Sequence, residues 1–141
     1  MSYSVIIPAY NEEKAICSIL NELNKSLSDF GKPYEIIVVN DCSTDSTRNE
    51  IINSGIPVVL IDHPSNKGYG AALKTGIEKS KYDIIVITDA DGTYPNHKIP
   101  EIVSIALSES HDMVVGARTG SNVKIPLIRK PAKWAINKLA N

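Results

Sequence analysis

The chain has 141 residues, of which 43% are hydrophobic and 22% are charged, and its formal net charge is −1. This size and balance fit one domain with a core large enough to fold without disulfides, and no nucleic-acid partner is expected. The two cysteines, Cys17 and Cys42, show neither metal-binding spacing nor a disulfide framework, which suits a reducing, cytoplasmic location.

Predicted strands and helices alternate along the chain. The first strand covers 4–8 ("SVIIP"), and a helical pattern over 11–31 follows it, with apolar residues at three- and four-residue steps. Asn11 is the expected N-cap of this helix, and Gly31 is its expected stop. The other expected strands are 35–40, 57–61, 83–88 and 112–117, and the other expected helices are 45–54, 69–80 and 97–109.

The expected strands are continuously apolar, which is typical of strands covered on both faces. Strand alternating with helix predicts an α/β fold, a parallel-rich, Rossmann-like twisted sheet that is sandwiched by helices through right-handed crossovers. Ligands of such sheets bind beyond the carboxyl ends of the strands. Polar loops follow the expected strands at that edge: "PAYNEE", "NDCSTD", "NKGYG", "DADGTYP" and "GARTG". We expect these loops to form one site.

Asp89 and Asp91 stand one residue apart at the end of the strand expected over 83–88. Two close carboxylates raise each other's pKa unless a positive charge lies between them, so the pair indicates either open solvent or a cation. A divalent cation that bridges a diphosphate fits, and ordinary turn residues are the alternative. The sequence has no GxxxxGK[ST] phosphate loop, and "GYGAAL" over 68–73 has Leu73 where a dinucleotide loop needs a small residue.

The order of the loop motifs carries a more specific signal. "VIIPAYNEE", "VVNDCSTDST", "NKGYGAALKTGI", "ITDADGTYP" and "VVGARTG" together resemble the family-two glycosyltransferases with the A-type nucleotide-sugar (GT-A) fold. The resemblance covers almost the whole chain and is closest to the dolichol-phosphate mannosyltransferase and polyprenyl-phosphate glycosyltransferase branch. It implies an inverting enzyme that moves a hexose from a UDP- or GDP-sugar to polyprenyl or dolichyl phosphate with Mg²⁺ or Mn²⁺. The alternatives are transfer to a saccharide hydroxyl, and a fragment that binds donor and metal without turnover.

The resemblance also implies a base and ribose pocket, lined by Pro8, Ala9, Tyr10 and Glu12. Asp41 would accept a hydrogen bond from the base or the ribose, and its alternative role is that of a turn or helix cap. Cys42 stands where many relatives have glycine, which leaves the backbone of that turn less free. The three histidines match no motif, and we expect them to be surface or loop residues: His63, His97 and His111.

The same resemblance places Lys67 and Gly68 beside the donor, where Lys67 adds positive charge and Gly68 permits close backbone approach; a plain turn is the alternative. Asp89 would lie in the ribose and metal region and Asp91 would bind the metal, with Ala90 lining the site between them. No catalytic residue is assigned, because relatives usually carry the general base in an acceptor-side segment, here expected beyond Asn141.

The last part of the chain is basic, since residues 118–141 hold six Lys or Arg and no Asp or Glu. Arg118 is similar to the family arginine near the phosphates, where its fork of donors suits a diphosphate or an acceptor phosphate. We expect a donor-binding domain over 1–125 and a basic amphipathic helix over 126–141. This helix would be the start of a missing acceptor-side segment, so we expect the chain to be an N-terminal fragment of a longer enzyme.

The basic residues of this tail are either a solvated helix face or a surface for phosphates and anionic lipid, which would bring the chain to the cytoplasmic face of a membrane. No apolar run approaches the roughly 18 residues of a spanning helix. The N-terminus lacks the basic start of a signal peptide. Within these residues we therefore expect peripheral membrane association at most.

Overall fold

The computed structural model describes residues 2–108 and 111–117. Four parallel strands form one sheet in the order β3-β2-β1-β4: β1 (Tyr3–Ala9), β2 (Tyr34–Asn40), β3 (Val59–Asp62) and β4 (Ile84–Ile87). The helices between and after them are α1 (Ile16–Phe30), α2 (Thr47–Asn53), α3 (Tyr69–Lys79), the 3₁₀ turn η1 (Asn96–Lys98) and α4 (Ile99–Ser108). The predicted α/β fold with a helix-covered parallel sheet is confirmed.

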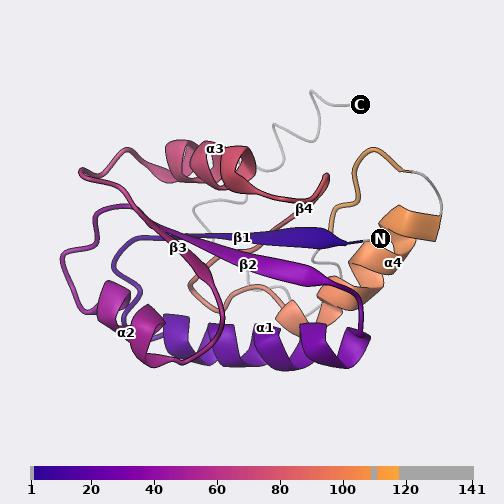
Figure 1. Ribbon diagram of the computed structural model, residues 1–141, viewed down its shortest axis with the longest axis horizontal. Helices are drawn as coiled ribbons and strands as arrows, with labels where there is room; N and C mark the ends of the chain where they lie inside the picture. The colour runs from indigo at the N-terminus through magenta and orange to yellow at the C-terminus, as the bar shows by residue number, and fades with distance from the viewer. Residues whose placement is uncertain (1, 109–110, 118–141) are drawn as a thin grey trace, which may run out of the picture.

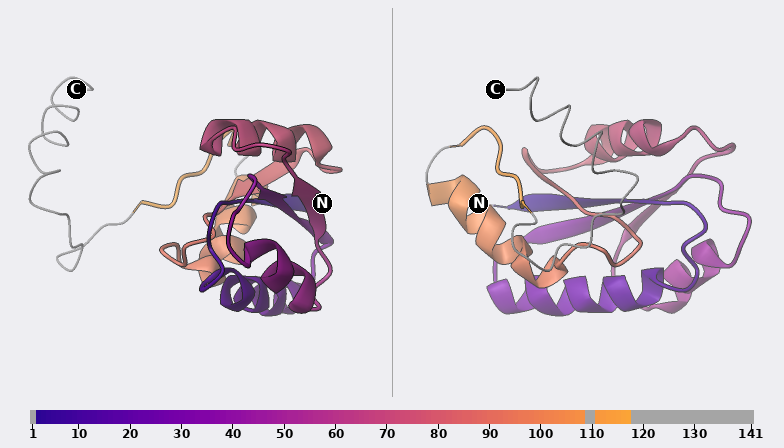
Figure 2. Two further views of the ribbon diagram at one scale, coloured as in Figure 1. Left: turned by 90° about the vertical axis from the view of Figure 1, so that its left-hand side faces the viewer. Right: turned by 180° about the vertical axis from the view of Figure 1, so that it is seen from behind.

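The sheet lies between two helical layers, with α3 on one face and α1, α2 and α4 on the other (Figures 1 and 2). All of β1 is buried, and its alternate residues supply the two faces of the core. The larger core joins Val5 and Ile7 of β1 to the apolar face of α1, made by Ile16, Ile19, Leu20, Leu23 and Leu27. The pattern over 11–31 therefore predicted the buried face of α1 correctly, and Gly31 ends the helix in the left-handed conformation.

The start of α1 differs from the prediction. The helix begins at Ile16, and Asn11 does not cap it; Asn11 instead has a positive φ of 56°. Its side-chain oxygen accepts a hydrogen bond from the Thr44 amide at 2.8 Å. A polar side chain that finds a partner in a neighbouring loop no longer serves its own helix, which explains the later start.

The strand expected over 112–117 is also absent from the part of the chain that the structure describes, where 111–117 form no ladder with β4. Met113 is 79% exposed and Val115 is 69% exposed, so this apolar run packs against no sheet. A strand needs a neighbour for its backbone groups, and apolar composition alone does not supply one. Two-sided burial holds for β1 and the later part of β2, whereas β3 and β4 are partly exposed.

Candidate functional site

A hollow of about 440 Å³ opens at the carboxyl edge of the sheet. Most of the predicted site residues line it together: Pro8, Ala9, Tyr10, Glu12, Asp41, Gly68, Asp89, Ala90 and Asp91. Lys67 is next to Gly68 but is not in the lining. Arg118, the basic tail and the helix expected over 126–141 lie outside the described residues. The lining also includes Asn66, Tyr69 and Ala72, which the sequence analysis did not select.

Two loops interlock on one side of the hollow. The amide of Glu12 donates to Oγ1 of Thr47 at 2.7 Å, and the amide of Glu13 donates to Oδ2 of Asp45 at 3.2 Å. The carboxylate of Glu13 in turn accepts the Ser46 amide at 2.9 Å. The acidic residues of "NEE" are thus held to the loop after β2, which places Glu12 at the hollow rather than in the first turn of α1.

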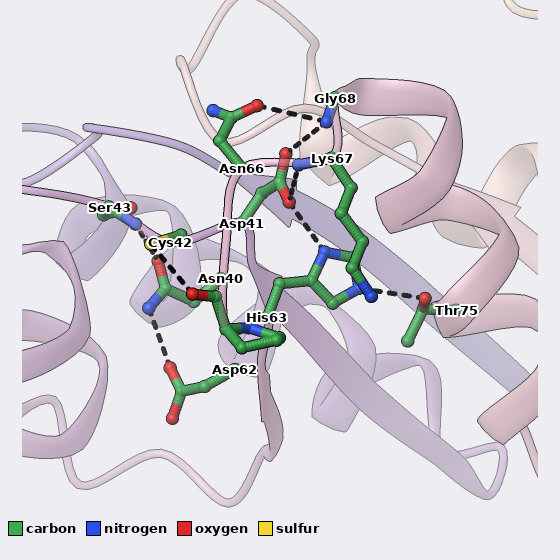
Figure 3. A network of polar contacts seen from close by, with 11 residues as sticks. Asn40, Asp41, Cys42, Ser43, Asp62, His63, Asn66, Lys67, Gly68 and Thr75 are labelled. Carbon is green, nitrogen blue, oxygen red and sulfur yellow. Dashed lines mark hydrogen bonds and ion pairs between the residues drawn. The ribbon is translucent and has the colours of Figure 1, made fainter.

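Asp41 is the most highly connected side chain of the site (Figure 3). Its Oδ1 accepts the Lys67 amide at 2.9 Å, and its Oδ2 accepts the Gly68 amide at 2.7 Å. Asp41 follows β2 and is only 3% exposed, so these bonds tie the end of that strand to the loop before α3. The backbone donors of this loop therefore point at Asp41.

His63 completes this network; it lies in the loop directly after β3, as one of the two expected placements has it, but it is buried and not at the surface. The side chain is buried, with Nδ1 at 2.6 Å from Oδ1 of Asp41 and Nε2 at 2.9 Å from Oγ1 of Thr75 (Figure 3). It links the ends of β2 and β3 to α3. The available signal was its place directly after the third strand, at the edge where the polar loops gather; Asp41 and Thr75 become its neighbours only through the fold.

The environment of Asp41 favours its ionised form. Burial alone would raise the pKa of this carboxyl, but hydrogen bonds from the Lys67 amide, His63 and the Gly68 amide outweigh burial and hold the pKa below its usual value. Asp41 therefore serves as a charged acceptor. It caps neither α1 nor α2, because its partners lie in the loop before α3.

The turn after Asp41 shows the strain expected from its sequence. Cys42 has a φ of 60°, in the region that glycine enters freely and other residues seldom adopt. Asn40 supports the turn, because its Nδ2 donates to Asp62 at 2.7 Å and its Oδ1 accepts the Ser43 amide at 3.2 Å. These contacts hold Cys42 in place beside the site.

Asp89 and Asp91 line the same hollow and follow β4, which is separated from β2 by β1 in the sheet. Tyr69, the first residue of α3, donates its hydroxyl to Oδ1 of Asp89 at 2.9 Å, and the Thr93 amide donates to Oδ1 of Asp91 at 2.8 Å. Partial burial and this bond raise the pKa of Tyr69 to about 12, so the hydroxyl keeps its proton. Burial and then the negative charges of Asp91, Asp45 and Asp89 raise the pKa of Glu12.

The comparisons with known proteins agree with this arrangement. The model of the family "Glycosyl transferase family 2" matches residues 4–140. The chain belongs to glycosyltransferase family 2. It is 33% identical over 135 residues to the dolichol-phosphate mannosyltransferase of Pyrococcus furiosus, in a match that covers 92% of this chain and 38% of that protein. This family 2 chain thus spans less than half the length of that relative.

Solved structures with the same fold include two with bound nucleotide and metal. One is the mannosyltransferase PcManGT of Pyrobaculum calidifontis in complex with GDP-Man and Mn²⁺, which is 25% identical to this chain. Its TM-score is 0.60, and the match covers 76% of this chain and 32% of that one. The glucosyl-3-phosphoglycerate synthase of Mycobacterium tuberculosis, in complex with Mn²⁺, UDP and phosphoglyceric acid, is 30% identical with a TM-score of 0.62, over 76% and 39%. The fold is therefore that of the GT-A glycosyltransferases.

The carboxylates of this family 2 chain fit a divalent cation that is shared with a ligand. Within residues 2–108 and 111–117, no three His, Cys, Asp or Glu side chains come together to hold a metal by themselves. Mg²⁺ is commonly held by one or two carboxylates, with phosphate oxygens and water completing the shell. Asp89 and Asp91 supply such a partial set, and Glu12 lines the same hollow. Burial and then the nearby negative charges of Asp91, Asp45 and Asp89 raise the pKa of Glu12.

In the part of this family 2 chain that the structure describes, no helix is both long enough and apolar enough to cross a bilayer.

Proposed function

We propose that this chain is the donor-binding part of an inverting glycosyltransferase that transfers a hexose from a UDP- or GDP-sugar to a polyprenyl or dolichyl phosphate. The observation that carries the proposal is the hollow at the carboxyl edge, which is lined both by the acceptor Asp41 and by the Asp89–Asp91 pair. A nucleoside diphosphate has a matching polarity, since its base and ribose carry hydrogen-bond donors and its diphosphate requires a cation.

Several of the predicted residues have a specific role in this proposal. Pro8, Ala9 and Tyr10 supply an apolar wall for the base, since Tyr10 is partly exposed at the hollow. Asp89 and Asp91 would hold Mg²⁺ or Mn²⁺, and the bound cation would neutralise the diphosphate leaving group. Arg118 would add a second positive group for the phosphates.

The lipid-phosphate acceptor is supported by the dolichol-phosphate mannosyltransferase relative. A phosphate monoester has its second pKa near ~6 and is largely ionised at neutral pH, so it needs no general base to become nucleophilic. A saccharide hydroxyl would need such a base, which the proposal places beyond Asn141. The lipid acceptor would bring the reaction to the cytoplasmic face of a membrane. Donor binding without turnover is the second candidate function, since the hollow carries groups for a donor and none that the sequence analysis assigns as a general base.

Nucleotide binding should depend on a divalent cation. Calorimetry with UDP and with GDP, in Mn²⁺ and then with a chelator, is expected to show at least about 10-fold weaker binding after chelation, since one charge-assisted contact is worth ~1.5–3 kcal/mol. Asp91→Ala should reproduce the loss in the presence of Mn²⁺. The matched control is Asp83→Ala, which removes the same charge just before β4, at the opposite edge of the sheet.

Equal affinity with and without chelator would remove the cation from the proposal. If Asp91→Ala binds like Asp83→Ala, Asp91 has no part in holding it.

The proposed lipid-phosphate acceptor can be tested separately, by the binding of the chain to vesicles. Vesicles that contain anionic lipid should co-sediment the chain in a salt-sensitive way, because each basic residue near such a surface contributes about 1 kcal/mol. Arg129→Ala/Lys130→Ala is expected to bind more weakly, and Lys25→Ala/Lys32→Ala, at the other end of the chain, should bind like the wild type. Binding that is absent, or equal for both double variants and indifferent to salt, would contradict a lipid-facing tail.

A further inference from the structure

The hydrogen-bonding capacity of Asp41 is almost fully used within the protein. Its Oδ1 receives His63 Nδ1 at 2.6 Å and the Lys67 amide at 2.9 Å, whereas its Oδ2 receives only the Gly68 amide, at 2.7 Å. Each oxygen of a carboxylate has about two acceptor positions. Oδ1 is therefore saturated, and one position remains on Oδ2 for a ligand in the hollow.

The geometry fixes His63 as a donor to Asp41. The pKa of the Asp41 carboxyl is lowered and the group is ionised, so it accepts a proton from Nδ1. In the neutral ring Nε2 then accepts the hydroxyl proton of Thr75, which lies 2.9 Å away on α3. The His63 side chain is only 4% exposed, so the ring has no room to turn toward solvent. Burial and the two ring contacts thus hold His63 at its position on Oδ1.

This occupancy matters because guanine and uracil present different donors. Guanine carries N1–H and an exocyclic N–H side by side, a pair that matches both oxygens of one carboxylate. Uracil carries a single N–H. A two-pronged bond needs an open position on Oδ1 as well as on Oδ2, and His63 together with Lys67 closes Oδ1. The solved relatives contain GDP-Man in one case and UDP in another, so the fold accommodates both bases.

We propose that His63 is a specificity-positioning residue, which saturates Oδ1 of Asp41 and thereby makes the site select a uridine over a guanosine diphosphate sugar. The inference rests on the proposed function, because it takes Asp41 as the group that meets the base. It goes further than the proposed function, because it names the nucleotide of the sugar donor and the residue that selects it.

The chain offers a matched pair of variants for the test. In His63→Asn the amide nitrogen replaces Nδ1, so a donor to Asp41 remains. In His63→Gln the longer side chain carries its amide to the position of Nε2, so the contact with Thr75 can remain while Oδ1 of Asp41 opens. Both are neutral amides that keep one of the two contacts of the ring, and thermal unfolding of each variant checks that the fold is retained.

The measurement is calorimetry with UDP and with GDP, each with Mn²⁺, on the wild type and both variants. The wild type should bind UDP at least about 10-fold more tightly than GDP, because one of the two adjacent guanine donors would find no partner on Asp41. His63→Asn should keep this ratio. In His63→Gln the ratio should fall several-fold toward unity, mainly through tighter GDP binding.

Two results would overturn the inference while leaving the proposed function intact. One is a wild type that binds GDP as tightly as UDP, a comparison that needs no variant. The other is a His63→Gln chain in which both affinities drop by the same factor, which is the behaviour of a purely structural histidine. A wild type that binds neither nucleotide would overturn the proposed function, and this inference with it.

Discussion

Replacement of Asp41 by alanine is expected to lower the free energy of unfolding by roughly 3–5 kcal/mol. The substitution removes one buried acceptor and leaves three donors facing the gap: the His63 ring and the amides of Lys67 and Gly68. Each buried group left without a partner costs about 1–3 kcal/mol, and part of this cost is recovered where water reaches the hollow. Urea-induced unfolding followed by circular dichroism measures the change.

Asp62→Ala is the matched control for this experiment. Asp62 ends β3, the strand next to β2, and its carboxylate binds Arg48 at 2.9 Å and Asn40 at 2.7 Å. Its side chain is 38% exposed, so we expect a loss of only about 1 kcal/mol or less. If Asp41→Ala were no more destabilising than Asp62→Ala, the loop before α3 would not depend on the buried carboxylate.

The same network predicts the response of the protein to acid. Burial alone would raise the pKa of Asp41, but its hydrogen bonds outweigh burial and lower the pKa to below the ordinary value of 3.8. A carboxyl with a lowered folded pKa contributes stability above its unfolded pKa, and this contribution is lost as pH falls through the folded value. Unfolding free energy should therefore decline below about pH 4. The unfolding free energy of Asp41→Asn should decline less steeply as pH falls. An unchanged slope in that variant would assign the acid response to Asp45 and Asp62, whose pKa values are also lowered.

The sequence was sufficient for the elements whose signal is local. The three- and four-residue spacing of Ile16, Leu20 and Leu23 depends only on the helical period, and these residues are buried in α1. The continuous apolar runs predicted β1 and β2, which the structure places in the centre of the sheet. The polar loops met at one edge because parallel strands point the same way, so that most of the candidate site followed from topology.

Three of the features that the sequence analysis placed wrongly or did not select share a different cause, which is contact between residues far apart in the chain. Asn11 has the composition of a helix cap, yet its partner is Thr44, 33 positions away. His63 belongs to no motif, and its burial arises from Asp41, 22 positions before it, and Thr75, 12 positions after it. Tyr69 reaches Asp89 across 20 positions. Periodicity within one element carries no information on such pairs.

A second large effect on stability is expected at Gly76, where replacement by alanine would add a single methyl group. It lies in α3 where the helix crosses β1, and a Cβ built there would sit 2.4 Å from Cγ2 of Ile6. Ile6 is fully buried and branched at Cβ, so it has little freedom to move away. Gly76→Ala should therefore destabilise the protein by about 1–3 kcal/mol through overpacking, despite a gain in helix propensity of up to ~1 kcal/mol.

Gly70→Ala separates the two contributions, because Gly70 lies in the same helix and a Cβ there would meet no atom within 4 Å. At this position only the propensity term acts, and the protein should gain up to about 1 kcal/mol. The opposite signs of the two alanine variants, measured in one series of urea unfolding curves, are the expected result. If both variants stabilised the protein equally, α3 would not be packed on β1 at Ile6, and the loop that carries Lys67 and Gly68 into the site would lose its support.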